Sequence, residues 1–101
     1  MDVTAWKNGP LDSIGLIFGI RVGAKNAKQF FDKRWTSVVV ELGRTPVTVR
    51  LSSSFWVASP ELRNVAFEEW MRHLQLIPWK PQRPPTLTLT PLGGNRFRLS
   101  R

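Results

Sequence analysis

The residue with the clearest capacity for acid–base chemistry is His73, the only histidine in the chain. It follows Glu69 by four residues, so on a helix the two side chains can meet across one turn. A catalytic dyad would also need a hydroxyl, amine or thiol nucleophile beside the base, and no pattern of residues marks one. The spacing therefore favours a contact at the protein surface, and we predict no catalytic residue.

Metal and cofactor chemistry have equally little support. One histidine with Glu68, Glu69 and a few scattered acids is a weak ligand set for a metal ion. The absence of cysteine excludes a thiolate nucleophile, a disulfide scaffold and cysteine-held metal clusters. Gly15, Gly19 and Gly23 are four residues apart, which fits neither the dinucleotide-binding fingerprint nor the phosphate-binding loop. We predict no metal and no cofactor.

The strongest chemical signal is an excess of positive charge. Fifteen Lys and Arg against seven Asp and Glu give a formal net charge of +8. Such a field attracts polyanions and raises their rate of association. No block of five or six like charges is present, so folding must gather any positive surface. We expect that surface to combine strand arginines, cations of the first helix and a tryptophan flanked by cations: Arg44, Arg50, Arg96, Arg98, Arg101, Lys25, Lys28, Lys33, Arg34, Trp79, Lys80 and Arg83.

These residues predict a small, non-catalytic protein that binds nucleic acid, or another polyanion, mainly through phosphate contacts. Arginines that stand out from a twisted sheet can meet successive phosphates. Trp79 could stack on a base, although packing over the end of a helix is the favoured interpretation of this residue. No recognition-helix pattern, aromatic RNA-binding strand motif or zinc finger is present. Strong sequence readout is therefore not expected.

Other functions stay open. An acidic protein could be the partner of the same cations, and the wide apolar face of a predicted helix over 59–77 could form a homodimer or bind another protein. A metal-free nuclease that uses Lys and Arg to stabilise phosphoryl transfer is a further alternative. The N-terminus lacks the features of a secretory signal, and no apolar run approaches a membrane span. We predict a cytoplasmic location and no membrane partner.

The longest periodic segment, residues 59–77, predicts one long helix. Ser59 can cap its N-terminus, and Pro60 suits the first helical position. Its apolar side chains cover an arc of roughly 240° at 100° per residue. That arc is wider than one sheet face needs, so part of it should meet a second layer or another subunit.

A hairpin is predicted before this helix, from residues 37–42 and 46–51. Gly43-Arg44 suits a two-residue turn. The register then places Val38 opposite Val49, Val40 opposite Val47 and Leu42 opposite Thr45.

A second hairpin is predicted near the C-terminus. The strand over 86–91 alternates leucine and threonine, and Gly93-Gly94-Asn95 gives a turn. This register sets Leu89 opposite Leu99 and Thr90 opposite Arg98, with the arginines on the outer face.

The remaining elements complete an α+β order within a single domain. Residues 1–13 read as an irregular arm, 15–22 as a central strand and 24–34 as a short helix with Asn26 as a candidate cap. We expect a largely antiparallel sheet of about five strands with both helices packed on it. The order of the first six elements matches the ferredoxin-like class. An open sheet crossed by the long helix and a partly closed barrel stay open as alternatives.

Overall fold

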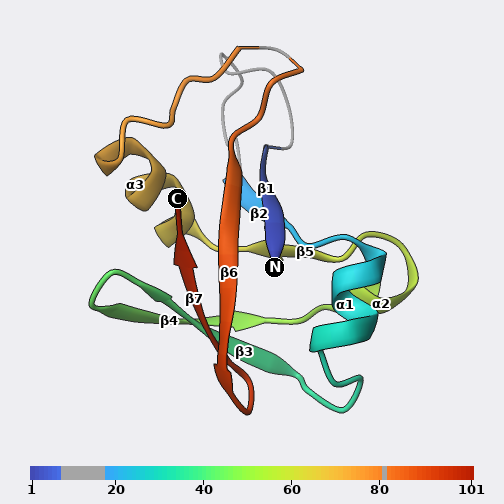
Figure 1. Ribbon diagram of the computed structural model, residues 1–101. Helices are drawn as coiled ribbons and strands as arrows, with labels where there is room; N and C mark the ends of the chain where they lie inside the picture. Colours follow the sequence, from blue (N-terminus) through green and yellow to red (C-terminus); the bar gives the residue numbers. More distant parts are fainter. Residues whose placement is uncertain (8–17, 81) are drawn as a thin grey trace.

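The computed structural model describes residues 1–7, 18–80 and 82–101, which form a curved sheet of seven strands with three short helices (Figure 1). The order of strands across the sheet is β4-β3-β7-β6-β1-β2-β5. The elements in chain order are β1 (Asp2–Lys7), β2 (Phe18–Arg21), α1 (Ala24–Phe30), β3 (Ser37–Leu42), β4 (Thr45–Arg50), α2 (Ser53–Val57), β5 (Glu61–Arg63), α3 (Val65–His73), β6 (Thr86–Gly93) and β7 (Arg96–Ser100).

The sheet is mixed and nearly closes on itself as a barrel. The β3–β7 pair is parallel, and the other neighbouring strands are antiparallel. The two edge strands, β4 and β5, approach each other, and Asn64 Nδ2 at the end of β5 donates to the carbonyl of Thr48 on β4 at 3.4 Å. The expected five-stranded, ferredoxin-like sheet is therefore wrong. The partly closed barrel, kept as an alternative, is nearer to the observed architecture.

Both predicted hairpin registers are confirmed. On β3 and β4, Val38 pairs with Val49, Val40 with Val47 and Leu42 with Thr45. On β6 and β7, Leu89 pairs with Leu99 and Thr90 with Arg98, with a register irregularity between Pro91 and Gly93. Alternation fixes these registers, because a slip of one residue would turn every buried side chain to the outer face.

The predicted long helix over 59–77 is wrong, because its first part is a strand. β5 pairs with β2, which would otherwise be an edge strand. Asn64 then caps α3: its Oδ1 accepts from the backbone N–H of Ala66 at 2.9 Å. The helix ends at His73, and Gln75 follows with a φ of 59°. The wide apolar arc therefore belongs to two elements, since Leu62 faces the core from a strand.

The N-terminal part also differs from expectation. Residues 2–7 of the predicted irregular arm form β1, which pairs with β2 and β6; residues 8–13 lie outside the described residues, as do 15–17 of the predicted strand over 15–22. The helix predicted over 24–34 ends at Phe30, as α1. Asn26 does not cap it, because its Nδ2 donates instead to the carbonyls of Asp2 at 2.8 Å and Val22 at 3.0 Å.

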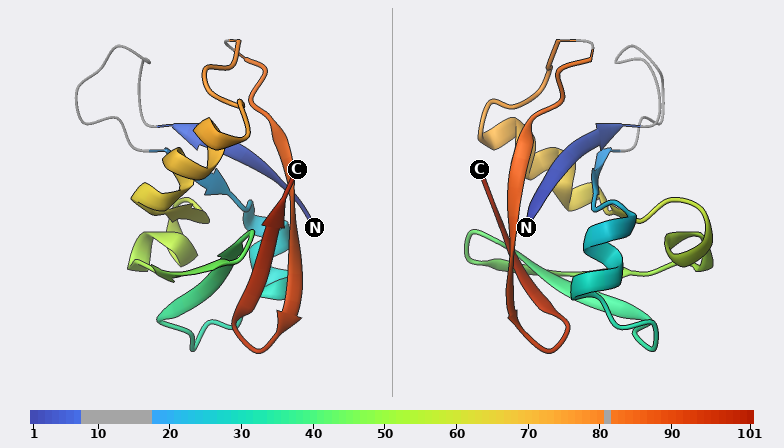
Figure 2. Two further views of the ribbon diagram at one scale, coloured as in Figure 1. Left: turned by 90° about the vertical axis from the view of Figure 1, so that its left-hand side faces the viewer. Right: turned by 45° about the vertical axis from the view of Figure 1, so that its right-hand side comes forward.

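The core fills the inside of the curved sheet. In Figure 1, α1 and α2 lie to the right of β6 and α3 lies to its left; the left view of Figure 2 shows α2 and α3 on the same side of β6 and β7. Phe97 from β7 stacks on Phe31 with ring centroids 4.8 Å apart, and Phe31 contacts Phe55 of α2 at 5.1 Å. Phe67 and Met71 of α3 are fully buried. Outward-facing side chains of the strands are left to meet solvent.

Candidate nucleic-acid interface

Four neighbouring strands, β4, β3, β7 and β6, carry a cluster of polar side chains on their outer side. Their buried residues, such as Val40 and Phe97, point inward, so the alternate residues point outward. The pairing registers place these outer residues in rows across the sheet. We name this surface the arginine face and define it by its exposed or half-buried side chains: Arg50, Thr48, Glu41, Arg96, Arg98 and Thr90.

Glu41 is the one carboxylate of the arginine face, and it is shared by two arginines. Its Oε2 accepts from Arg96 Nη2 at 3.3 Å and its Oε1 accepts from Arg98 Nη2 at 3.4 Å. The side chains of Arg96 and Arg98 remain 49 % and 55 % exposed. With Arg50, three positive charges stand against one negative charge, so the face keeps an excess of two.

The cations predicted on the first helix form a separate group. Lys25 and Lys28 are exposed on α1, and Lys33 is exposed in the loop that follows it. Arg34 is paired with Asp32 at 2.6 Å. The hydrogen bonds from the Arg34 side chain and backbone N–H lower the pKa of Asp32 to about 2, so Asp32 stays ionised at neutral pH and neutralises Arg34.

The predicted residues of the proline-rich loop lie elsewhere again. Lys80 and Arg83 belong to the segment between α3 and β6, which lies at the top of Figure 1, away from α1. Trp79 packs its ring edge-on against buried Phe18, with centroids 5.7 Å apart. Trp79 therefore packs against the core, but its ring contact is with β2 and not with the end of a helix as the favoured interpretation had it.

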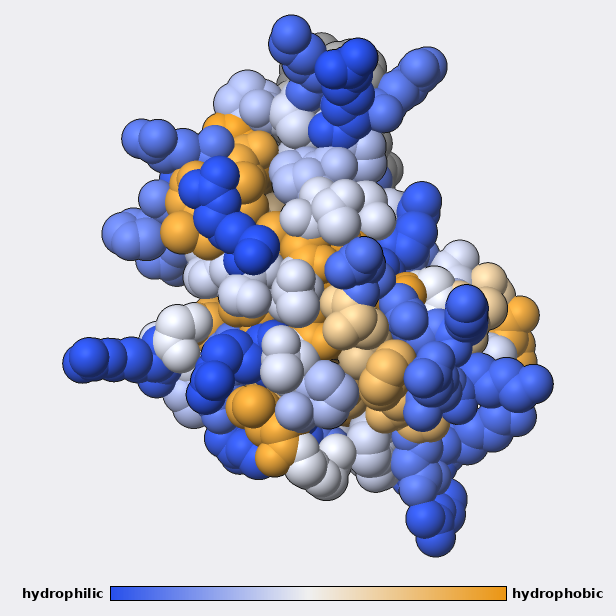
Figure 3. All heavy atoms as spheres, in the orientation of Figure 1, coloured by the Kyte–Doolittle hydropathy of each residue, from blue (hydrophilic) through white to orange (hydrophobic). Residues whose placement is uncertain are grey.

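The twelve predicted residues therefore do not share one surface. Arg96 and Arg98 come together around Glu41, and Arg50 belongs to the same arginine face from β4; Arg44 lies at the tip of the β3–β4 hairpin, and Arg101 follows β7. Hydrophilic side chains project at the top, left and lower right of the side drawn in Figure 3. The fold therefore does not form a single positive patch that includes the first helix.

A second cationic cluster was missed by the sequence reasoning. Arg21 on β2 and Arg63 on β5 each place an Nη2 3.7 Å from a carboxylate oxygen of Glu61, whose side chain is only 5 % exposed. The Arg63 guanidinium also lies over the Trp6 ring, 4.8 Å from its centroid. The sequence signal for this cluster is the alternation of polar Glu61, apolar Leu62 and polar Arg63, which is typical of a strand. It was not used because the segment was predicted to be helical.

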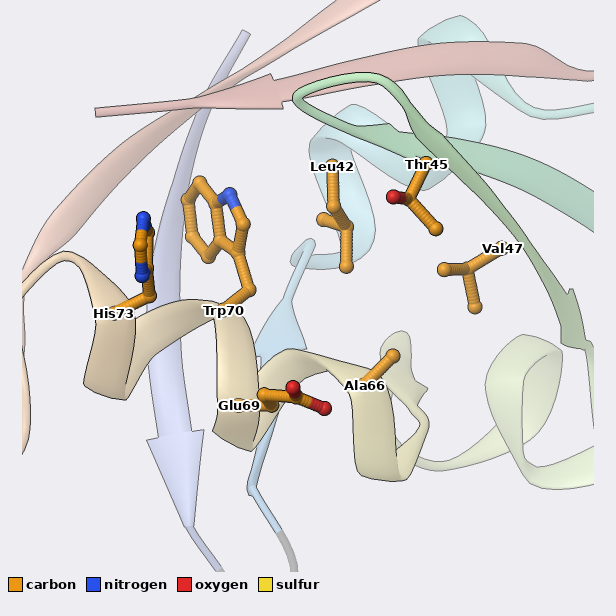
Figure 4. Close-up of a pocket in the computed structure, with 7 residues that line it drawn as sticks. All are labelled: Leu42, Thr45, Val47, Ala66, Glu69, Trp70 and His73. Atoms are coloured by element: carbon orange, nitrogen blue, oxygen red, sulfur yellow. The ribbon is translucent and has the colours of Figure 1, made fainter.

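The predicted contact between Glu69 and His73 is not formed in the described part of the chain. Figure 4 shows the Glu69 carboxylate and the His73 ring pointing in different directions. Both line a hollow of about 340 Å³ between α3 and the tip of the β3–β4 hairpin, which we name the α3 groove; its lining residues are Leu42, Thr45, Val47, Ala66, Glu69, Trp70 and His73.

The described residues offer no clear site for a metal ion. Among residues 1–7, 18–80 and 82–101, no three His, Asp or Glu side chains group where they could ligate one. Nor does any helix in these ranges have the length and apolar character to span a membrane. Comparisons of the chain with protein-family models, with curated proteins and with solved structures found no match in any of the three.

Proposed function

We propose that this protein binds nucleic acid through its phosphates, without strong sequence readout and without catalysis, and that the arginine face makes the contact. The observation that supports this proposal is that Arg96 and Arg98, both half exposed, share the single carboxylate of Glu41, while Arg50 points outward from β4, two strands from β7. A cytoplasmic location, where nucleic acid is present, is part of the proposal.

The spacing of the arginines suits a chain of phosphates. Arg96 and Arg98 are two residues apart on one strand, about 6.6 Å, which is about two axial steps of 3.4 Å along a nucleic-acid strand. A guanidinium can donate two parallel hydrogen bonds to one phosphate. The hydroxyls of Thr48 and Thr90, on the same face, can add further phosphate contacts.

Glu41 must give up its two partners when a phosphate binds. Its ion pairs are half exposed, and pairs of this kind contribute about 1 kcal/mol or less. The exchange therefore costs little, and the net charge of +8 favours the approach of the polyanion. No aromatic side chain belongs to the arginine face, so base stacking is not part of this interaction.

Removing two arginines from the face tests the proposal. The double variant Arg96→Ala with Arg98→Ala should bind a mixed-sequence single-stranded oligonucleotide more weakly. The slope of log K against log salt concentration should become shallower by about 1.4, at about 0.7 for each lost contact. Fluorescence anisotropy between about 50 and 200 mM salt measures both quantities.

The matched control removes the same charge from α1. Lys25→Ala with Lys28→Ala also lowers the net charge by two, but both residues lie outside the arginine face. This variant should keep the wild-type slope. Equal slopes for the two double variants would mean that net charge alone governs binding, and a wild-type protein without salt-dependent binding would refute the proposal.

A further inference from the structure

The α3 groove is lined by the apolar side chains of Leu42, Val47, Ala66 and Trp70, with the polar side chains of Thr45 and His73 and one carboxylate, that of Glu69. Leu42 and Val47 from the hairpin face Trp70 of α3 across it, and Glu69 lies at its rim (Figure 4). A hollow of this size, about 340 Å³, is within the range that buries a side chain or a small ligand. An apolar body with a charged end would match this lining.

A second hollow continues the groove along α3. It shares Ala66 and Glu69 with the first and adds Val65, Glu68 and Arg72. Val65, the first residue of α3, is 85 % exposed. Glu69 therefore lies between two hollows that could each receive an apolar side chain.

The charge of Glu69 is uncompensated. Asp32, Glu41, Glu61 and Glu68 each have an arginine partner, whereas Glu69 has no ion pair within the described residues. On a protein with a net charge of +8, an unpaired carboxylate beside an apolar groove is complementary to a cation carried on an apolar segment.

The neighbouring strand edge argues against docking by strand addition. The register of the β3–β4 hairpin, closed by a two-residue turn, turns the backbone groups of Pro46 and Thr48 to the free edge of β4. Pro46 has no N–H, and the Thr48 carbonyl already accepts from Asn64. The edge beside the groove therefore offers few backbone partners, and an occupant would be held mainly by its side chains.

We propose that the α3 groove binds a short segment of another protein in which an apolar side chain neighbours an arginine or lysine. The apolar side chain would pack against Trp70, and the cation would pair with Glu69. A second copy of this chain is a poorer occupant, because a net charge of +8 repels a second chain with the same charge more strongly than it repels a short segment with one cation. This site is separate from the arginine face and does not depend on nucleic-acid binding.

Two dipeptide probes test the proposal: N-acetyl-phenylalanyl-arginine amide and its neutral counterpart, in which citrulline replaces arginine. In ¹H–¹⁵N titrations of the whole protein, the arginine probe should shift the amides of Val47, Ala66 and Glu69 at millimolar concentration. Its affinity should exceed that of the citrulline probe by roughly two- to fivefold, as expected for an exposed ion pair.

Two charge variants identify the carboxylate. Glu69→Gln should reduce the affinity for the arginine probe to that for the citrulline probe. Asp2→Asn, which removes the same charge from an exposed position on β1 that lines neither hollow, should leave it unchanged. Equal affinity of both probes for the wild type, or equal effects of the two variants, would overturn the proposal. Self-association with shifts at the same amides would also overturn it, in favour of a second copy.

Discussion

Replacing Phe97 with alanine is expected to lower the free energy of unfolding by about 4 kcal/mol. The Phe97 side chain is 1 % exposed and points inward from β7. Its ring stacks on Phe31 and meets Trp35 edge-on, with centroids 6.2 Å apart. Alanine would leave a cavity where the sheet meets the segment after α1, and domains of this size have only about 5–15 kcal/mol of stability.

Urea unfolding followed by far-UV circular dichroism measures this loss. Phe97→Leu is the matched control, because leucine keeps most of the apolar volume and should cost about 1.5 kcal/mol or less. Near-UV circular dichroism should also change in the alanine variant, since Trp35 loses a ring neighbour. If the alanine and leucine variants had equal stability, the packing of Phe97 against Phe31 and Trp35 would not contribute the expected stability.

Replacing Gly19 with alanine is expected to cost about 2–3 kcal/mol, because there is no room for a Cβ atom between β2 and its neighbours. An added Cβ would lie 2.5 Å from the backbone carbonyl oxygen of Leu62 on β5 and 3.1 Å from Cε3 of Trp6 on β1. The backbone oxygen cannot rotate away, so β2 and β5 must separate. The Trp6 ring would also move, and with it the guanidinium of Arg63 that lies over it.

Gly94→Ala provides the control for this substitution. Gly94 has a φ of 54°, and nothing lies within 4 Å of an added Cβ. The Gly94→Ala substitution should therefore lower the free energy of unfolding by about 1–2 kcal/mol, because alanine disfavours this left-handed backbone conformation. Thermal and urea unfolding of the two variants should rank Gly19→Ala as the less stable. The opposite order would show that β2 and β5 can separate at little cost.

The two hairpins were predictable because residues close together in the sequence determine their turns and strand registers. Gly43 and Arg44 define the first turn, and the alternation of leucine and threonine defines which side of β6 is buried. These two features fixed the registers and placed Arg96 and Arg98 on the outer side. The association of β3 with β7 was not predictable, since parallel pairing of distant strands leaves no mark on a single sequence.

The error at residues 59–77 has a physical cause. A Ser-Pro start and a long apolar period favour a helix locally, whereas pairing of Glu61–Arg63 with the open edge of β2 is a tertiary interaction. Asn64 is also a strong capping residue, and its position divides the segment.

The candidate site was predictable only in part. The strand arginines were identified from their outward parity, but the role of Glu41 depends on the parallel β3–β7 pair, which sets it beside Arg98. The cluster of Arg21, Arg63 and Glu61 depends on β5, so the helical assignment excluded it.

Glu41→Gln tests the role of the arginine face most directly, because the expected effect is a gain of binding and not a loss. The amide frees Arg96 and Arg98 from their shared carboxylate. Affinity for a single-stranded oligonucleotide at about 100 mM salt should rise by roughly two- to fivefold, as expected for release of exposed ion pairs. Glu68→Gln, with the same charge change on α3, should have a clearly smaller effect. An unchanged affinity for Glu41→Gln, or an equal gain for both variants, would contradict phosphate binding by this face.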